Sequence, residues 1–170
     1  MSTLNVDTIQ DKGAAFEHAR LVQVVNTQTG TLATDTTAVP DDDTIPQNDE
    51  GLQVMTLAIT PTHASNKLKI DVVVYGGSAG TGDTITACLF QDSTVGSLAS
   101  AQHVTQGSST SSFPVVFTHF MAAGTTSSTT FKVRAGLTAG TFSFNGANGT
   151  RGLGGVMASS ITISEIRRDA

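Results

Sequence analysis

The chain has no tryptophan, a single cysteine, and few charged or aromatic side chains. Aromatic residues make up 5% and charged residues 14% of its 170 residues. Cys88 has no second cysteine with which to form an intramolecular disulfide, and its apolar neighbours predict a small buried core residue. Because serine and threonine together supply about a quarter of the chain, its surface is predicted to be built from hydroxyl groups rather than charges.

Positive charge is scarce as well. Nine lysines and arginines against fourteen acids give a formal net charge of −5, with no basic stripe to neutralise phosphates, which disfavours nucleic-acid binding. No uninterrupted apolar run approaches the length of a membrane span, so we expect no membrane insertion. The first ten residues lack the basic and apolar regions of a signal peptide, and we expect the protein to be made in a cytoplasm.

What the chain does contain is a series of short segments in which apolar and polar residues alternate, the pattern of strands with one buried face. The clearest lies near the C-terminal end, where Ile161, Ile163 and Ile166 are interspersed with polar residues. The segments are bounded by turn-forming residues and recur at the spacing of sandwiches and jelly rolls. The predicted strands are 21–26, a weak polar strand ending at 39, 52–60, 67–75, 84–91, 99–105, 113–122, 129–136, 141–145 and 158–166.

These segments predict one all-β domain over residues 20–170, an antiparallel β-sandwich or jelly roll. Residues 52–60 and 67–75 flank the turn 61–66, and we expect them to pair with each other as antiparallel neighbours. The core is predicted from the alternating apolar positions. It includes Val54, Leu57, Ile59, Leu68, Ile70, Val72, Val74, Leu89, Val116, Phe131, Val133, Ile161 and Ile163.

Residues 1–19 are predicted to form a short N-terminal arm outside this core. Within the arm, Leu4, Val6 and Ile9 are the apolar members of an alternating stretch. An isolated two-stranded piece is marginally stable in water. We therefore expect the arm to dock on another protein by adding a strand to an exposed sheet edge, with these three side chains filling pockets.

Patterns that would indicate catalysis are absent from the sequence. The four histidines have no metal-ligand spacing, and no Gly-x-Ser-x-Gly elbow is present. Asp83, Asp92 and Glu165 cannot be placed opposite one another as an acid–base pair. The glycine-rich stretch 76–82 lacks the lysine and the helix of a phosphate-binding loop. We therefore expect no enzymatic activity and no cofactor.

The acidic loop 40–51 is one candidate binding segment. It carries Asp41, Asp42 and Asp43, and carboxylate oxygens suit a hard cation such as calcium. The spacing of an EF-hand is missing, however, so a solvated acidic loop is the alternative interpretation.

Three further loops, 76–82, 106–112 and 145–152, are candidates for contact with a partner. Loops held by a rigid scaffold often carry function, and small polar residues can reach hydrogen-bonding groups without aromatic stacking. Solvated connections between strands are the alternative. The candidate binding residues in these loops are Ser78, Thr81, Ser109, Thr110, Asn145, Asn148 and Arg151.

The opening segment Met1-Ser-Thr-Leu-Asn-Val-Asp-Thr-Ile-Gln10 resembles the N-terminus of tail-fibre and related virion proteins of tailed bacteriophages, especially cyanophages and marine phages. The body is similar to a C-terminal head module of such fibres. That similarity lies in residues 21–30, 60–70, 129–136 and 154–166.

The resemblance implies a homotrimeric, non-enzymatic head on the virion surface. Its N-terminus would attach to other virion proteins at the tail or baseplate, and its distal loops would contact a receptor on the host surface. A surface poor in charge also leaves strand edges unprotected, which fixed oligomerisation would cover.

The chain departs from a typical fibre in having no shaft between arm and head. Two functions therefore stay open: a tail-fibre-like head that presents loops to the host, and a trimeric decoration or cement protein that stabilises the capsid.

Overall fold

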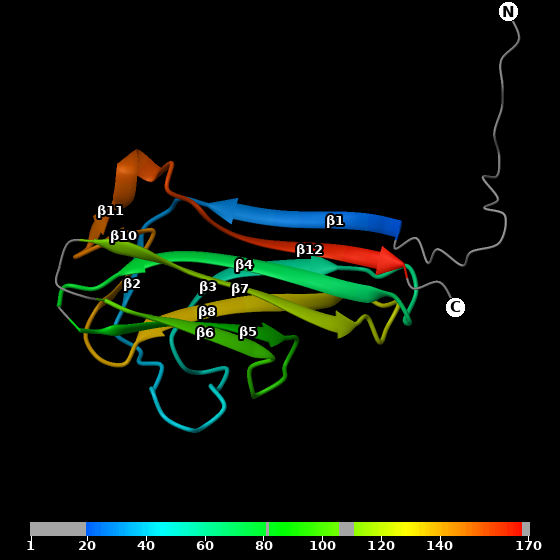
Figure 1. Cartoon of the computed structure of the whole chain (residues 1–170), viewed down its shortest axis with the longest axis horizontal. Helices are drawn as coiled ribbons and strands as arrows, with labels where there is room; N and C mark the ends of the chain where they lie inside the picture. Colours follow the sequence, from blue (N-terminus) through cyan, green and yellow to red (C-terminus); the bar gives the residue numbers. More distant parts are fainter. Residues whose placement is uncertain (1–19, 81, 106–110, 168–170) are drawn as a thin grey trace, which may run out of the picture.

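The computed structural model describes residues 20–80, 82–105 and 111–167, which form two antiparallel sheets packed face to face (Figure 1). The predicted β-sandwich is confirmed. The first sheet contains β1 (Arg20–Thr29), β2 (Ala33–Asp35), β4 (Lys67–Gly77), β7 (Ser112–Ala122), β9 (Phe142–Phe144) and β12 (Ser159–Arg167). The second contains β3 (Leu52–Ile59), β5 (Thr84–Gln91), β6 (Ala99–Val104) and β8 (Thr129–Leu137). Within these ranges no helix is long and apolar enough to cross a membrane.

The strand order places β4 at the centre of the first sheet. Along one edge β4 pairs with β7 over its full length, and along the other it pairs first with β12 and then with β9. β1 pairs with β12 and forms an outer strand. The second sheet runs in the order β3-β8-β5-β6. Pro114 lies on β7, the strand at the opposite edge from β1, which fits the restriction of proline to sheet edges.

The core lies between the two sheets and follows the alternation of the sequence. In β4, Leu68, Ile70, Val72 and Val74 are fully buried, and burial of such side chains contributes roughly 1.5–3 kcal/mol each. The buried core cluster comprises Met55, Ile59, Leu68, Ile70, Val72, Val74, Ile85, Ala87, Leu89, Val115, Ala123, Phe131, Val133, Ala135, Leu137, Phe142, Phe144, Ile161 and Ile163.

Two parts of the predicted core need correction. Val116 is 59% exposed, because it points outward from β7 while its neighbour Val115 points into the core. In β3 a bulge shifts the register between Gln53 and Met55, so Met55 is fully inserted while Val54 is only partly buried. An extra residue in one strand of this kind reverses the alternation for the residues beyond it.

The predicted pairing of residues 52–60 with 67–75 is wrong. β3 pairs with β8 in the second sheet, whereas β4 lies in the first sheet, so the loop between them crosses from one sheet to the other. At this crossing the carboxylate of Glu165 on β12 accepts hydrogen bonds from Thr62 and Asn66 of the loop. A turn-rich segment of six residues can form either a hairpin within one sheet or a crossing between two sheets. The turn residues of 61–66 therefore could not distinguish these two connections.

The segment before β3 covers the side of the second sheet that faces away from the first sheet. Val39 packs there against Cys88 and Phe90, whose side chains point away from the main core. This second layer explains why β5 is buried on both faces. The predicted burial of Cys88 is confirmed, and desolvation raises the pKa of its thiol to about 12, which leaves it unreactive at neutral pH.

Candidate functional site

Several loops meet at one end of the sandwich, which we call the loop end: residues 30–32, 77–80, 82–83, 111–112 and 145–157. The register brings them together, because Gly77 at the end of β4 pairs with Ser112 at the start of β7, and Gly76 pairs with Phe144. The start of β1 and the end of β12 lie at the opposite end of the molecule (Figure 1). The loop end is thus the part of the sandwich farthest from residue 20, where the preceding segment of the chain joins it.

The most prominent part of the loop end is the segment after β9. It contains the small hairpin of β10 (Gly146–Ala147) and β11 (Thr150–Arg151), followed by the 3₁₀ turn η1 (Gly152–Gly155) (Figure 1). Leu153 in the turn and Val156 just after it are 76% and 84% exposed. Both are large aliphatic side chains of the same protruding segment, and a partner that covered them would remove apolar surface from water.

Asn145 fixes the base of this segment. Its side chain is fully buried and donates hydrogen bonds to the carbonyls of Thr29 (2.8 Å) and Thr31 (3.0 Å). Its Oδ1 accepts from the amide and hydroxyl of Ser159, and its carbonyl accepts from the Gly152 amide at 2.9 Å. Asn145 has a φ of 55°, a left-handed conformation that asparagine tolerates better than most residues. One side chain therefore ties together β1, β12 and the protruding hairpin.

Arg151 lies between two hollows beside this hairpin. The first has a volume of about 580 Å³ and is lined by Gly30, Thr31, Leu32, Arg151, Gly154 and Gly155. The second, of about 270 Å³, is lined by Ser112, Ala147, Asn148, Thr150, Arg151 and Gly152. Among the described residues, the rest of both linings is uncharged and mostly small, so the guanidinium supplies the charge that these residues give the two hollows.

The structure separates the predicted loop residues into three groups. Asn148 and Arg151 are exposed and share the second hollow, as a binding role requires. Ser78 and Asn145 are buried, and Ser78 donates a hydrogen bond to the Gly80 carbonyl, so as a correction these two support the loops from inside and present nothing to a partner. The other predicted residues of the loops and arm lie outside the described residues. They are Thr81, Ser109, Thr110, Leu4, Val6 and Ile9.

The acidic loop does not assemble a cation site in the part of the chain that the structure describes. Asp41, Asp42 and Asp43 are all exposed. The Asp42 carboxylate accepts hydrogen bonds from the amide and hydroxyl of Thr44, and these bonds lower its pKa. Among the described residues no three His, Cys, Asp or Glu side chains come close enough together to hold a metal ion. The three aspartates are thus arranged as a solvated turn.

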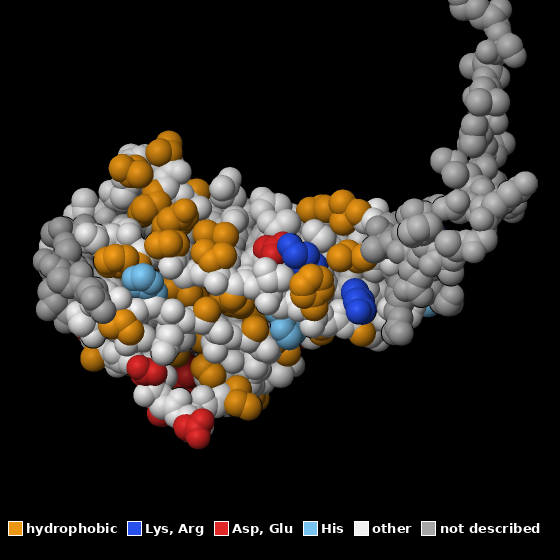
Figure 2. Space-filling view, viewed as in Figure 1, with side chains coloured by type: hydrophobic (Ala, Val, Ile, Leu, Met, Phe, Trp, Pro, Cys, Tyr) orange, Lys and Arg blue, Asp and Glu red, His pale blue; other side chains and the backbone are white. Residues whose placement is uncertain are grey.

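A second notable surface is the outer face of the first sheet, which we call the outer face. Hydrophobic side chains are spread over it around an adjacent acid and base (Figure 2). Val116 and Phe120 on β7 are 59% and 56% exposed, and Val24 on β1 is also exposed. The sequence signalled this surface weakly, because outward positions of these strands carry apolar residues where polar ones were expected.

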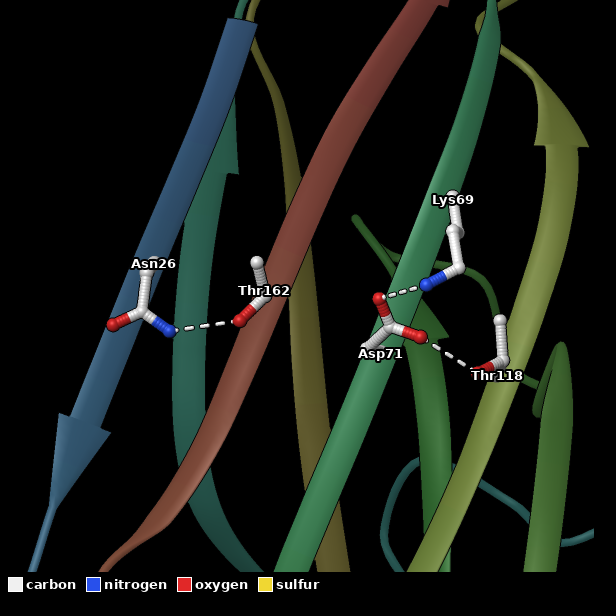
Figure 3. Close-up of polar contacts among 5 residues, drawn as sticks. All are labelled: Asn26, Lys69, Asp71, Thr118 and Thr162. Atoms are coloured by element: carbon white, nitrogen blue, oxygen red, sulfur yellow. Dashed lines mark hydrogen bonds and ion pairs between the residues drawn. The ribbon is translucent and has the colours of Figure 1, made fainter. Parts of the chain in front are cut away.

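A row of polar side chains crosses the outer face from β1 to β7 (Figure 3). Asn26 donates to Thr162 Oγ1 at 2.8 Å, and Asp71 accepts from Lys69 Nζ at 2.5 Å and from Thr118 Oγ1 at 2.6 Å. Partial burial opposes ionisation of Asp71, but the bonds from Lys69 and Thr118 outweigh it and lower the pKa of Asp71. The polar groups of the row are therefore matched to one another.

Comparisons with known proteins leave the chain without a family. No family model matches it, and no curated protein sequence matches it.

Solved structures resemble it only in outline. Eiger TNF from S. frugiperda is 13% identical, with 89% of this chain and 96% of that chain covered at a TM-score of 0.43. A chain of the infectious bursal disease virus Gt strain is 11% identical, with 98% and 43% covered at a TM-score of 0.44. The enzymatically active domain of bacteriophage CBA120 tailspike protein 4 is 11% identical, with 88% and 20% covered at a TM-score of 0.23. At these values the matches carry no argument about function.

Proposed function

We propose that this protein is a non-enzymatic structural protein of a bacteriophage virion, a tail-fibre-like trimeric head that presents its loop end to the host surface. The observation that carries the proposal is that the two ends of the sandwich differ. The segment preceding residue 20 joins at one end of the sandwich, and the loop end with its protruding hairpin lies at the other. An anchor and a contact surface at opposite ends are what a fibre head requires, and the sequence resemblance to fibre proteins points the same way.

The outer face supports the trimeric part of the proposal. Its exposed valines and phenylalanine lose contact with water when covered, which favours association. Lys69 and Asp71 in its centre neutralise each other within one subunit. A second copy of the chain can therefore be placed against this face without the cost of burying that charge unpaired.

Replacement of Phe120 tests the outer face as the contact between copies. We expect the wild-type protein to sediment as a trimer and Phe120→Asp to sediment as a monomer, because the contact loses its apolar ring and would have to desolvate a charged carboxylate. Val104→Asp is the matched control, since Val104 is similarly exposed on β6 of the second sheet. Analytical ultracentrifugation at micromolar concentration gives the readout. A monomeric wild type, or a Phe120→Asp trimer, contradicts the assignment.

The position of the protein on an intact particle tests the function itself. We expect cryo-electron microscopy to place it at the tail or baseplate, and the purified head to bind susceptible but not resistant host cells. Copies at three-fold or quasi-three-fold positions of the capsid, together with capsids that burst under osmotic stress when the protein is missing, would instead establish a decoration protein. Absence from the particle would overturn both functions.

A further inference from the structure

We propose that Arg151 and the two hollows beside it bind a carbohydrate that carries an oxyanion, either a carboxylate or a phosphate. This inference rests on the proposed function, since it names the site and ligand class through which the loop end would contact a host surface. It is carried by three observations at the site: the charge of the lining, its polar groups and volume, and the rigidity of the backbone that forms it.

The charge of the lining favours an anion. Among the described residues no acid lines either hollow, although the protein as a whole has a net charge of −5. The guanidinium of Arg151 makes no hydrogen bond or ion pair with another described residue. By contrast, the guanidinium of Arg134 donates hydrogen bonds to the carbonyls of Glu50 and Gly51. A guanidinium that has no partner among the described residues offers a planar pair of donors that matches a carboxylate or phosphate.

The other groups of the lining favour a polyhydroxylated ligand. Thr31 in the first hollow, and Ser112, Asn148 and Thr150 in the second, provide donors and acceptors at the sides of the arginine. The larger hollow, at about 580 Å³, is wide and open to solvent, so a ligand would lie along it rather than be enclosed by it. Two hollows that share one arginine suit an extended ligand, with the oxyanion at the arginine and neighbouring sugar units on either side.

The site is held in one shape before any ligand arrives. Gly30 lies so close to η1 that a Cβ on it would come within 1.9 Å of the Gly155 carbonyl oxygen, so these two segments are in direct contact. Leu153, Gly154 and Gly155 all have left-handed φ angles, and for leucine this conformation is strained. The buried bonds of Asn145 hold the segment in this arrangement. A preformed site loses little conformational entropy on binding.

Titration of the full-length protein with defined sugars tests the site. The probes are trigalacturonate for the carboxylate, mannose 6-phosphate for the phosphate, and neutral maltotriose, measured by calorimetry and by shifts of the Gly30, Gly154 and Gly155 amide resonances. We expect at least one anionic probe to bind with a Kd below about 10 mM and to shift these resonances, and maltotriose to bind more weakly. Binding should weaken as salt is added.

Variants of the arginine separate this site from general charge attraction. Arg151→Gln should weaken binding about tenfold or more, and Arg151→Lys should restore only part of it because the planar fork is lost. Lys67→Gln is the matched control, an exposed cation at the opposite end of the sandwich, and should bind like the wild type. Circular dichroism and thermal unfolding confirm that each variant is folded.

Three results would overturn the inference: no binding of either anionic sugar, equal binding of maltotriose, or unchanged binding by Arg151→Gln. Each is distinguishable from failure of the proposed function. A head that sits on the tail and binds host cells equally well with Arg151→Gln keeps the function and removes the site. A protein that binds trigalacturonate through Arg151 but is absent from the particle keeps the site and removes the function.

Discussion

Replacement of Glu165 by alanine should cost this protein about 4 kcal/mol of stability, a large part of what a domain of this size has. Glu165 lies on β12, between β1 and β4, and has no exposed surface. Its Oε1 accepts hydrogen bonds from the amide and hydroxyl of Thr62, both at 2.8 Å, and from Asn66 at 2.6 Å, while Oε2 accepts from Gln23 at 2.6 Å. Removal of the carboxylate takes the acceptor away from the buried amide of Asn66 and from the part-buried bonds of Thr62 and Gln23.

Glu165→Gln should be milder, at about 2 kcal/mol, because its carbonyl can still accept from one side while its new amide group faces a donor. Ser164→Ala is the control on the same strand, where the side chain points to the outer face, and should change stability by less than about 0.5 kcal/mol. Urea unfolding at neutral pH measures all three. Equal stability of Glu165→Ala and Ser164→Ala would show that the hydrogen bonds do not hold the sheet crossing.

The same carboxylate should make stability depend on pH. Burial acts to raise its pKa, but hydrogen bonds from Gln23, Asn66 and Thr62 outweigh burial and lower it from 4.5 to about 2. Since the folded state has the lower pKa, the stabilisation is complete above pH 4.5 and is lost as the pH falls toward 2. The loss amounts to about 3 kcal/mol. Between pH 4.5 and pH 2 the free energy of unfolding should therefore fall by about 3 kcal/mol less for Glu165→Gln than for the wild type.

The strands could be predicted from the sequence because their signal is local. Alternation of apolar residues, broken by glycine and proline, places β4, β5 and β8 within two residues of their observed bounds. Pairing between strands depends on contacts far apart in the sequence. The crossing between β3 and β4 is held by Glu165, about a hundred residues beyond the loop that it binds. No local pattern near residues 61–66 contains that information.

Only part of the candidate site could be predicted, again because local signals are visible in the sequence and contacts between distant residues are not. Asn148 and Arg151 were found because a glycine-rich segment of polar residues marks an exposed loop. Asn145, in the same segment, has an identical local signature but is buried, because Thr29 and Ser159 from distant strands close around it. The bulge at Val54 and the outward position of Val116 were missed because burial of an apolar residue was inferred from its type, and the outer face carries apolar residues too.

Replacement of Asn145 by alanine should have the second large effect, about 3–4 kcal/mol of lost stability. The carbonyls of Thr29 and Thr31 lose their donor, and the hydroxyl and amide of Ser159 lose their acceptor. Alanine must also adopt the left-handed φ of 55°, which costs about 1 kcal/mol more than it does for asparagine or glycine.

Two further variants separate the hydrogen bonds from the backbone strain. Asn145→Gly removes the bonds but accepts the positive φ, so it should be about 1 kcal/mol more stable than Asn145→Ala. Asn148→Ala is the matched control for strain, because Asn148 has a φ of 49° in the same hairpin but an exposed side chain. It should lose about 1 kcal/mol and no more.

Guanidinium unfolding of the four proteins measures these differences, and amide hydrogen exchange locates them. If the bonds of Asn145 hold the protruding segment, Asn145→Gly should speed exchange in residues 145–157 well beyond the effect of Asn148→Ala. Wild-type stability of Asn145→Gly would mean that the buried network contributes nothing, because glycine removes the bonds without adding strain. The loop end would then owe its shape to the close approach of Gly30 and Gly155 alone, and Gly30→Ala, rather than Asn145→Gly, would be the variant that opens it.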